Sequence, residues 1–472
     1  NGNSVIRLMM HSIECKLLVS SSSVLVPGEI PIYPMNGRKG NSRLEPLLPA
    51  ITALDGDTFM SPWVQQNLST LVNDYDSNLN NDSTIRSILT HMQDSKNLTV
   101  SWTKLTALCS GKNQILQSFT AKYQKKIRDL EQGLEFKGKK KAVIGIGGSS
   151  SGARALSFFM KDDISYFDNL DFEYFKNFFL KNNIRDYVFF IISKSGDTFE
   201  TLALLNLLII EGEKIKDYNI FDSMVVITEN KESILKSFST KKNIKIVEHN
   251  PDIGGRFSIL SETGMLPFMD LNLNVEDGSE KFIKLLNKDN DLSPTKNAAI
   301  ILTCMTEMKL SIYCNLIYNS RLEHFSYWFH QLHGESLGKS NNALTPTTSI
   351  CPKDHHSMMQ LYLGGPKNKF FNIFSPPDNN IYDNFTDEGF YNIENFTPNE
   401  LLKTQYQSVV SVFTEKEIPH RKIEISDHQN PINIIELFSY FILETILLGK
   451  MMNINPYGQP EVQLLKDKVF KN

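Results

Sequence analysis

A run of glycines and serines, Gly145-Ile146-Gly147-Gly148-Ser149-Ser150-Ser151-Gly152, follows a short apolar segment and could hold an anion. Position 150 is Ser, so the run lacks the last glycine of the dinucleotide-binding fingerprint. Ala153-Arg154 stands where a nucleotide P-loop needs Lys followed by Ser or Thr. Free amides and hydroxyls at a helix start suit a phosphate monoester, because the helix dipole favours an anion there. The alternative is a tight turn whose serines only cap the helix.

A second turn of the same kind, Ser193-Lys194-Ser195-Gly196-Asp197-Thr198, follows the next strongly apolar segment. Its three hydroxyls match the oxygens of a phosphate. The alternative is an N-cap box, with Asp197 or Thr198 capping the following helix. Two such turns after neighbouring strands would both lie at the carboxyl edge of one sheet, where ligands of open α/β sheets bind.

Further along, a glycine pair precedes an arginine in the run Asp252-Ile253-Gly254-Gly255-Arg256-Phe257-Ser258. Paired glycines let the backbone approach another group closely. Arg256 offers a fixed cation for an oxyanion. Taken alone, such a run is more often only a turn.

The segment from Ser326 to Lys339 reads as a helix that carries Gln331, Glu335 and Lys339 at i,i+4 spacing, so these three share one face. Spacing alone favours an exposed polar stripe with a Glu335–Lys339 pair. The run 334–340 mimics a P-loop, but it is one residue short between its glycines and ends a helix instead of starting one. ATP binding is therefore rejected.

Asp354-His355-His356-Ser357 precedes a short apolar helix. Adjacent histidines could bind a metal, but no third ligand with supporting spacing is visible. A single His acting as an acid or base at a helix start is the simpler interpretation. Near the C-terminus, residues 455–460 lead into a helix expected over 460–470, in which Lys466 alone would pass as a surface lysine.

These residues are placed by a regular alternation of apolar and helical segments, which predicts two α/β units in tandem with mainly parallel sheets. Strands are expected at 142–146, 187–192, 224–228, 244–247, 312–318, 370–374 and 409–413. A buried helix is expected at 435–448. The organisation predicted is an N-terminal arm and helical region over 1–100, a first α/β domain over 101–290 and a second over 291–472.

Composition excludes several classes of protein. Of the 472 residues, 41% are hydrophobic and 22% charged, which is ordinary for folded domains. A net charge of −4 provides no basic field for nucleic acid. No apolar run approaches the roughly 18 residues that cross a bilayer. Five cysteines form no CxxC pair, which argues against a disulfide scaffold or zinc cluster and for a reducing, cytoplasmic compartment.

Taken together and in this order, the segments resemble the phosphoglucose isomerase family, most closely its compact bacterial type. The matching pieces span residues 142–466 and are Gly145–Ser149, Ser193–Gly196, Gly254–Ser258, Gln331–Lys339, His356 with Gln360, and Asn455–Lys466. The resemblance implies two sugar-isomerase (SIS-type) α/β/α domains per subunit and a homodimer with active sites at the interface. It also implies interconversion of glucose 6-phosphate and fructose 6-phosphate, with no metal or organic cofactor, no nucleic acid and no membrane.

The resemblance also implies roles for individual residues. Glu335 corresponds to the base that moves a proton between C2 and C1, and Arg256 to the cation beside the enediolate. His356, supplied by the neighbouring subunit, and Lys466 correspond to the ring-opening pair. Substrate-binding positions are Gly148, Ser149, Ser193, Lys194, Ser195, Thr198, Gly255 and Gln331. Asp197 replaces a common Thr and is expected to add negative charge near the phosphate.

Two other interpretations compete with this one. The first is another sugar-phosphate isomerase on the same domain, acting also on mannose 6-phosphate or in amino-sugar metabolism. The second is a sugar-phosphate-binding regulator that keeps the anion-binding turns without catalysis. A regulator would lack Glu335 or His356 and would usually carry a basic helix-turn-helix, which the sequence does not show. Glu335, His356 and the second α/β domain favour the phosphoglucose isomerase family over both alternatives.

Overall fold

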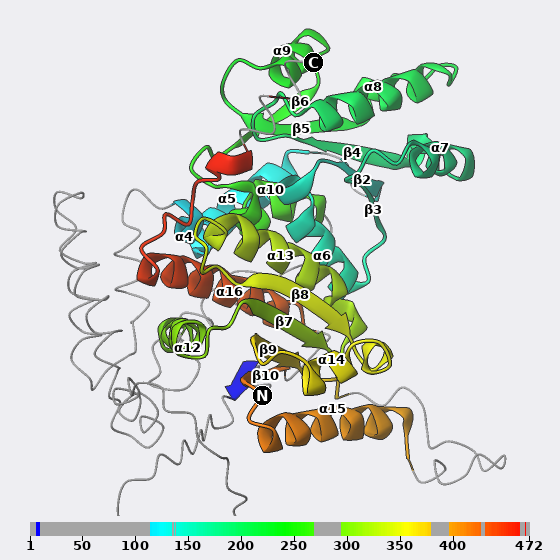
Figure 1. The fold of residues 1–472 in the computed structure, drawn as a ribbon. Helices are drawn as coiled ribbons and strands as arrows, with labels where there is room; N and C mark the ends of the chain where they lie inside the picture. The colour runs from blue at the N-terminus through cyan, green and yellow to red at the C-terminus, as the bar shows by residue number, and fades with distance from the viewer. Residues whose placement is uncertain are drawn as a thin grey trace, which may run out of the picture.

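The computed structural model describes residues 6–9, 114–134, 136, 138–268, 294–378, 396–425, 430–462 and 468. These residues form two five-stranded, mainly parallel sheets with helices on their faces (Figure 1). The predicted α/β class is therefore confirmed. The domain boundaries proposed at 100 and 290 fall outside the described residues and stay predictions.

The first sheet is parallel throughout, in the order β3-β2-β4-β5-β6. Its strands are β2 (Lys140–Ile144), β3 (Ile164–Phe167), β4 (Tyr187–Ile192), β5 (Met224–Glu229) and β6 (Lys245–His249). From β2 the chain moves outward to β3 and then returns to β4 on the other side. The carboxyl ends of β2 and β4 therefore flank a topological switch point, the usual ligand position in open α/β sheets.

The second sheet has the order β1-β10-β9-β7-β8 and is parallel except for β1. Its strands are β1 (Ile6–Met9), β7 (Ile312–Ile317), β8 (Thr345–Ile350), β9 (Lys369–Phe374) and β10 (His420–Ile425). Strand β1 comes from the region expected to be an arm, and it pairs antiparallel to β10 at the sheet edge. The sequence pattern did not predict β1 or β8.

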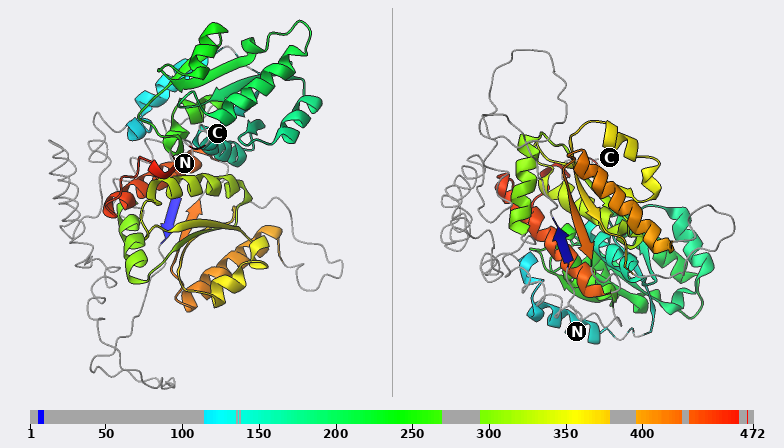
Figure 2. Two further views of the ribbon diagram at one scale, coloured as in Figure 1. Left: turned by 45° about the horizontal axis from the view of Figure 1, so that its top comes forward. Right: turned by 90° about the horizontal axis from the view of Figure 1, so that it is seen from below.

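Helices cover both faces of both sheets, and one set of helices lies between them (Figure 2). The set between the sheets includes α5 (Ala121–Gln132), α6 (Ser151–Met160), α13 (Glu323–Leu337) and α16 (Pro431–Met451). The outer face of the first sheet packs against α7 (Phe172–Lys181) and α8 (Phe199–Glu213), and that of the second against α14 (Met359–Gly364) and α15 (Pro398–Glu415). Both sheets are therefore covered on two sides, which explains the continuous apolar run of a central strand such as β4.

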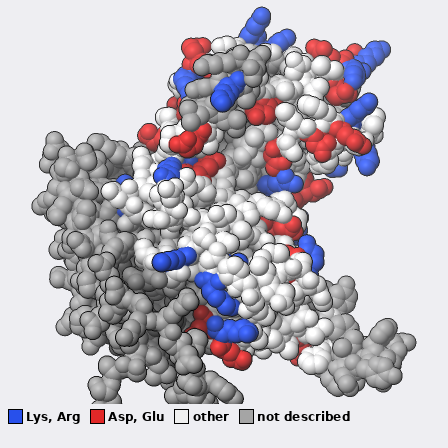
Figure 3. All heavy atoms as spheres, viewed as in Figure 1, with Lys and Arg blue, Asp and Glu red and all other residues white. Residues whose placement is uncertain are grey.

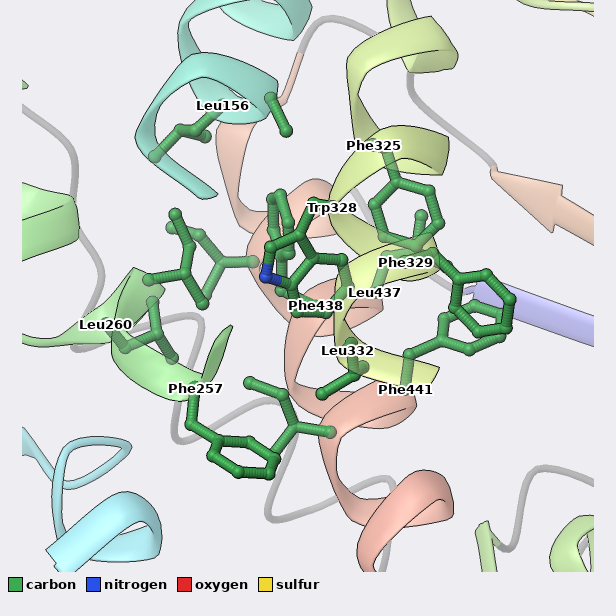
Figure 4. Packing of buried hydrophobic residues seen from close by; sticks show 14 of the residues in the cluster. Leu156, Phe257, Leu260, Phe325, Trp328, Phe329, Leu332, Leu437, Phe438 and Phe441 are labelled. Carbon is green, nitrogen blue, oxygen red and sulfur yellow. The ribbon is translucent and has the colours of Figure 1, made fainter. Parts of the chain in front are cut away.

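The central core connects the two units through Trp328 of α13, which is 1% exposed (Figure 4). Its ring lies 4.5 Å from that of Phe438 on α16, in an edge-to-face arrangement. The indole Nε1 donates a hydrogen bond to the backbone carbonyl of Arg256, at 3.1 Å. Because an aromatic of this size anchors a core strongly, Trp328 fixes α13 relative to the segment that carries Arg256.

The strand expected at 409–413 is wrong, because these residues lie inside α15. A capping box between Thr397 and Glu400 starts this helix, and its buried residues Tyr406, Val409 and Phe413 recur at helical spacing. The neighbouring valines have high strand propensity, but packing of this face against the second sheet decides the structure. The strand of this region is β10, a few residues later.

One described helix, α16, is long and apolar enough to span a membrane by length and composition, with a mean hydropathy of 1.6. However, 89% of its most apolar window is buried inside the structure. Glu444 on this helix forms an ion pair at 2.5 Å with Arg421 of β10, and both side chains are buried. Since core helices pass the same test, α16 is weak support for a membrane span.

Candidate functional site

The first expected anion-binding turn follows β2, at the switch point of the first sheet. Here η3 (Gly147–Ser149) leads into α6, and Gly147 has a positive φ of 60°, which favours glycine. The hydroxyl of Ser150 donates to the carbonyl of Gly147 at 3.2 Å, and its side chain forms no cap on α6. The serines therefore do not cap the helix as the alternative supposed, and Ser149 lies half-exposed beside the helix start.

The second expected turn follows β4, on the other side of the switch point. Contacts among its own hydroxyls hold them in place. Ser193 donates to the hydroxyl of Thr198 at 2.9 Å and accepts from the amide of Gly196 at 3.1 Å. The hydroxyls of Ser195 and Thr198 lie 3.5 Å apart. The side chain of Thr198 forms no cap on α8. Three hydroxyls thus meet at one helix start, as predicted.

Two charged side chains of this turn bind other parts of the protein. The carboxylate of Asp197 accepts from the amide of Ile234 at 2.8 Å, at the start of α9 (Ile234–Lys241), where the helix dipole favours a negative charge. The ammonium of Lys194 donates to the carbonyl of Pro251 at 2.6 Å and lies 3.6 Å from Glu229. Burial lowers the pKa of Lys194. Both residues connect the turn to neighbouring segments.

The first turn is in direct backbone contact with the glycine pair before Arg256, at the start of η6 (Gly255–Leu260). A Cβ atom built on Gly148 would lie 2.3 Å from the carbonyl carbon of Gly255, far inside van der Waals contact. The hydroxyl of Ser258 donates to the carbonyls of Gly148 and Gly255, at 3.1 and 2.7 Å. The predicted close approach of the Gly-Gly backbone is therefore real, and its partner is the first turn.

Arg256 is 2% exposed and binds two parts of the chain at once. One terminal nitrogen lies 3.0 Å from a carboxylate oxygen of Glu335, and Nε donates to the hydroxyl of Ser336 at 2.8 Å. The other terminal nitrogen donates to the carbonyls of residues 456, 457 and 458, at 2.6, 2.8 and 3.2 Å. Burial lowers the pKa of Arg256, and the adjacent Glu335 opposes that change.

Glu335 lies in the last turn of α13, half-buried, with both carboxylate oxygens in hydrogen bonds. Oε2 accepts from Arg256, and Oε1 accepts from the amide nitrogen of Gln331 one turn earlier, at 2.9 Å. Gln331 in turn accepts from the hydroxyl of Ser151 on α6, at 2.8 Å. The carboxylate is thereby held at a fixed orientation beside the first turn.

The sequence did not indicate that Ser151 and Ser336 take part, because a serine at a helix start or inside a helix carries no distinctive signal. Gln331 and Glu335 share one helix face as their spacing predicted. The prediction that Lys339 shares this face is wrong, because α13 ends at Leu337, and the ammonium of Lys339 binds a backbone carbonyl in place of Glu335. Lys339 donates to the carbonyl of Asn455 at 2.6 Å.

The adjacent histidines His355 and His356 lie away from the site formed by Glu335 and Arg256. The ring of His355 binds the hydroxyl of Tyr318 at 2.7 Å, and burial lowers the pKa of His355. His356 is exposed, directly after η9 (Lys353–His355). Within the described residues, no group of three or more His, Cys, Asp or Glu side chains could hold a metal ion.

Within one chain, His356 is far from Glu335. Helix α13 returns the chain from the carboxyl end of β7 to the amino end of its parallel neighbour β8, and Glu335 lies near the end of that return. His356 comes after the carboxyl end of β8. A six-residue strand is roughly 20 Å long. The two residues therefore lie at opposite ends of the strands of the second sheet, Glu335 near the amino ends and His356 near the carboxyl ends. Lys466 lies outside the described residues.

Comparisons with known proteins identify the family of this chain. The sequence profile of the phosphoglucose isomerase family matches residues 66–351, more than half of the chain. The chain belongs to the phosphoglucose isomerase family. This membership confirms the resemblance found in the sequence, and with it the enzyme class, an isomerase.

Similar members of the phosphoglucose isomerase family come from archaea and from bacteria, and two archaeal ones serve as examples. "Glucose-6-phosphate isomerase" of Methanocaldococcus jannaschii is 28% identical over 330 residues, which are 68% of this chain and 81% of that protein. "Probable glucose-6-phosphate isomerase" of Methanococcus maripaludis is 30% identical over 338 residues, 68% of this chain and 75% of its own.

Two solved structures share the fold of this family member. A hypothetical protein of Thermus thermophilus gives a TM-score of 0.67 at 22% identity, covering 87% of this chain and 98% of that one. A glucose-6-phosphate isomerase of Chlamydia trachomatis gives a TM-score of 0.62 at 16% identity, covering 86% and 77%. At these identities the likeness concerns the fold alone.

Proposed function

We propose that this protein interconverts glucose 6-phosphate and fructose 6-phosphate through a cis-enediolate, with Glu335 carrying the proton between C2 and C1. The observation that supports this most is the placement of the Glu335 carboxylate. It lies between Arg256 and Gln331, beside the Gly148–Gly255 contact, at the switch-point edge of the first sheet. One carboxylate within reach of both carbons can remove the proton and return it.

Each part of the site has a task in this reaction. The hydroxyls and helix starts of the two turns bind the phosphate, which is remote from the reacting carbons, so its binding energy can orient the sugar. Ser149, Ser193, Ser195 and Thr198 supply the hydroxyls. Arg256 is a buried, fixed guanidinium that stabilises the enediolate charge as it develops. Gln331 orients Glu335 and lines the sugar site.

Ring opening requires a second copy of the chain. A cyclic sugar needs one proton given to its ring oxygen and one taken from O1, a task for His356 with Lys466. Because His356 and Glu335 lie at opposite ends of the strands of the second sheet in one chain, His356 completes the site that contains Glu335 of another copy. Leu361, 44% exposed on α14, follows His356 by five residues and supplies apolar surface for that contact. The working unit is therefore a homodimer.

The surface and the cysteines fit a cytoplasmic enzyme with a small-molecule substrate. In the view of Figure 3, Lys and Arg side chains alternate with Asp and Glu over the first unit. The described cysteines Cys304, Cys314 and Cys351 are free and buried. Free buried thiols are typical of a reducing compartment.

The test is conversion of fructose 6-phosphate, read through glucose-6-phosphate dehydrogenase, in the presence of a chelator. We expect activity in the wild type and none in Glu335→Gln, whose amide keeps hydrogen-bonding capacity but cannot accept the proton. Tight binding of substrate by Glu335→Gln, measured by calorimetry, would show an intact site. Wild-type turnover by this variant would refute the assignment of the base.

The shared site has its own test. Glu335→Gln and His356→Ala homodimers are mixed, partly unfolded and refolded so that subunits exchange. A mixed dimer then holds one site with both Glu335 and His356, and activity absent from either parent should appear. No activity in mixtures that contain mixed dimers would place both residues in the same subunit.

A further inference from the structure

Two cations bind four consecutive backbone carbonyls of one turn. Arg256 donates to the carbonyls of Pro456, Tyr457 and Gly458, and Lys339 donates to that of Asn455. The turn also packs on the end of α16, where the amide of Ile454 donates to the carbonyl of residue 449. We call residues 455–458 the carbonyl turn.

The carbonyl turn lies beside the base, and Lys339 connects it to the helix that bears the base. Arg256, which binds three of the carbonyls, also binds Glu335 and contacts Gln459 at 3.4 Å. Lys339 follows the last residue of α13 by two positions. Its ammonium therefore connects the end of α13 to the carbonyl turn directly, independently of Arg256.

The like charges of Lys339 and Arg256 are held close enough to influence each other. Burial, followed by the charge of Arg256, lowers the pKa of Lys339 to about 8, against an opposing effect of Glu335. Placing two cations together costs free energy unless negative groups offset them. Here the carbonyl oxygens and one carboxylate do so, which makes the turn part of the charge balance around Glu335.

On the basis of the proposed function, we propose that Lys339 is a positioning residue of the active site, which holds the carbonyl turn and the residues after it against Glu335. The residues after the turn begin a helix at 460–462. Without Lys339, the carbonyl of Asn455 loses its link to the end of α13, while Arg256 still binds the other three carbonyls. The turn then shifts on the side nearest α13. Catalytic rates are sensitive to shifts of about 1 Å.

The fold itself should tolerate this change. The bond from Lys339 to Asn455 is exposed to solvent, so water can replace the ammonium at that carbonyl. Exposed polar interactions of this kind contribute little to the free energy of unfolding. A variant without the ammonium therefore reports on positioning more than on folding.

The experiment compares Lys339→Met, Lys339→Arg and a matched control, Lys416→Met. Lys416 is an exposed lysine at the end of α15, on the outer face of the second sheet. For each protein, kcat and KM for fructose 6-phosphate and the melting temperature are measured. Amide hydrogen exchange is followed in a peptide that spans residues 453–462.

For Lys339→Met we expect kcat to fall at least about tenfold, with KM within about threefold of wild type, because the turn supports the base and not the phosphate site. Exchange in 453–462 should speed up, while the melting temperature stays near that of Lys416→Met. Lys339→Arg should recover most of kcat and slow the exchange again.

Wild-type kcat in Lys339→Met, or Lys339→Arg no better than Lys339→Met, would overturn the inference. Unchanged exchange in 453–462 would overturn it as well. The exchange measurement does not depend on turnover, so it separates a failure of this inference from a failure of the proposed isomerase activity.

Discussion

Replacing Gly148 by Ala would test whether the contact between the two glycine turns sets the geometry of the site. The new Cβ would lie 2.3 Å from the carbonyl carbon of Gly255, where ordinary contact begins at 3.4 Å. The two backbones must therefore separate by roughly 1 Å, because neither atom belongs to a flexible side chain. That displacement moves Arg256, the next residue, relative to Glu335.

From this separation we expect kcat/KM for fructose 6-phosphate to fall about 100-fold, the effect typical of a 1 Å misplacement. Overpacking should lower the free energy of unfolding by roughly 1–3 kcal/mol, so the protein still folds. The coupled assay and urea denaturation measure the two effects.

The matched control for this substitution is Gly133→Ala. A Cβ there meets only backbone carbonyl oxygens of its own helix, the nearest being that of Leu130 at an ordinary 3.4 Å, and the residue lies at the end of α5. This control should keep wild-type kinetics. Wild-type kcat/KM in Gly148→Ala would refute the argument that the turn contact positions Arg256.

Two further predictions concern buried charges. Glu262 accepts hydrogen bonds from Tyr123 and the amide of Asn250 and pairs with His249, and its pKa is lowered from 4.5 to about 2 although burial opposes this. The ionised carboxylate therefore stabilises the fold fully above pH 4.5. As pH falls toward 2, the free energy of unfolding should decrease by about 3 kcal/mol through protonation of Glu262. Urea denaturation midpoints of the wild type and of Glu262→Gln across that pH range measure this loss. Arg421→Met should cost roughly 3–5 kcal/mol by leaving Glu444 buried without its partner, measured by urea denaturation at pH 7; a loss under about 1 kcal/mol would contradict the pairing.

The sequence predicted the elements that repeat a strong local pattern. The run at 187–192 is apolar throughout and forms β4 as expected, because both faces of its sheet are covered. The serine turns after β2 and β4 were also predictable, since each follows an apolar strand and opens a helix. The i,i+4 spacing correctly placed Gln331 and Glu335 on one helix face.

Other features depend on contacts between distant segments and have no local signal. The partner of the Gly254–Gly255 backbone is more than a hundred residues away in sequence, and the carbonyls that bind Arg256 are about two hundred residues away. The charge of Asp197 was expected to face the phosphate, but its carboxylate binds the start of α9. Such pairings are fixed by tertiary packing, which spacing along the chain does not encode.

The central claim, proton transfer by Glu335 through an enediolate, is tested most directly by isomerisation in D₂O followed by NMR. The account predicts that deuterium from solvent accumulates at C2 of glucose 6-phosphate and C1 of fructose 6-phosphate with the wild type, because the proton on the carboxylate exchanges with water. Glu335→Gln should incorporate none. Turnover by the wild type without any deuterium uptake, or uptake by Glu335→Gln at the wild-type rate, would contradict the account.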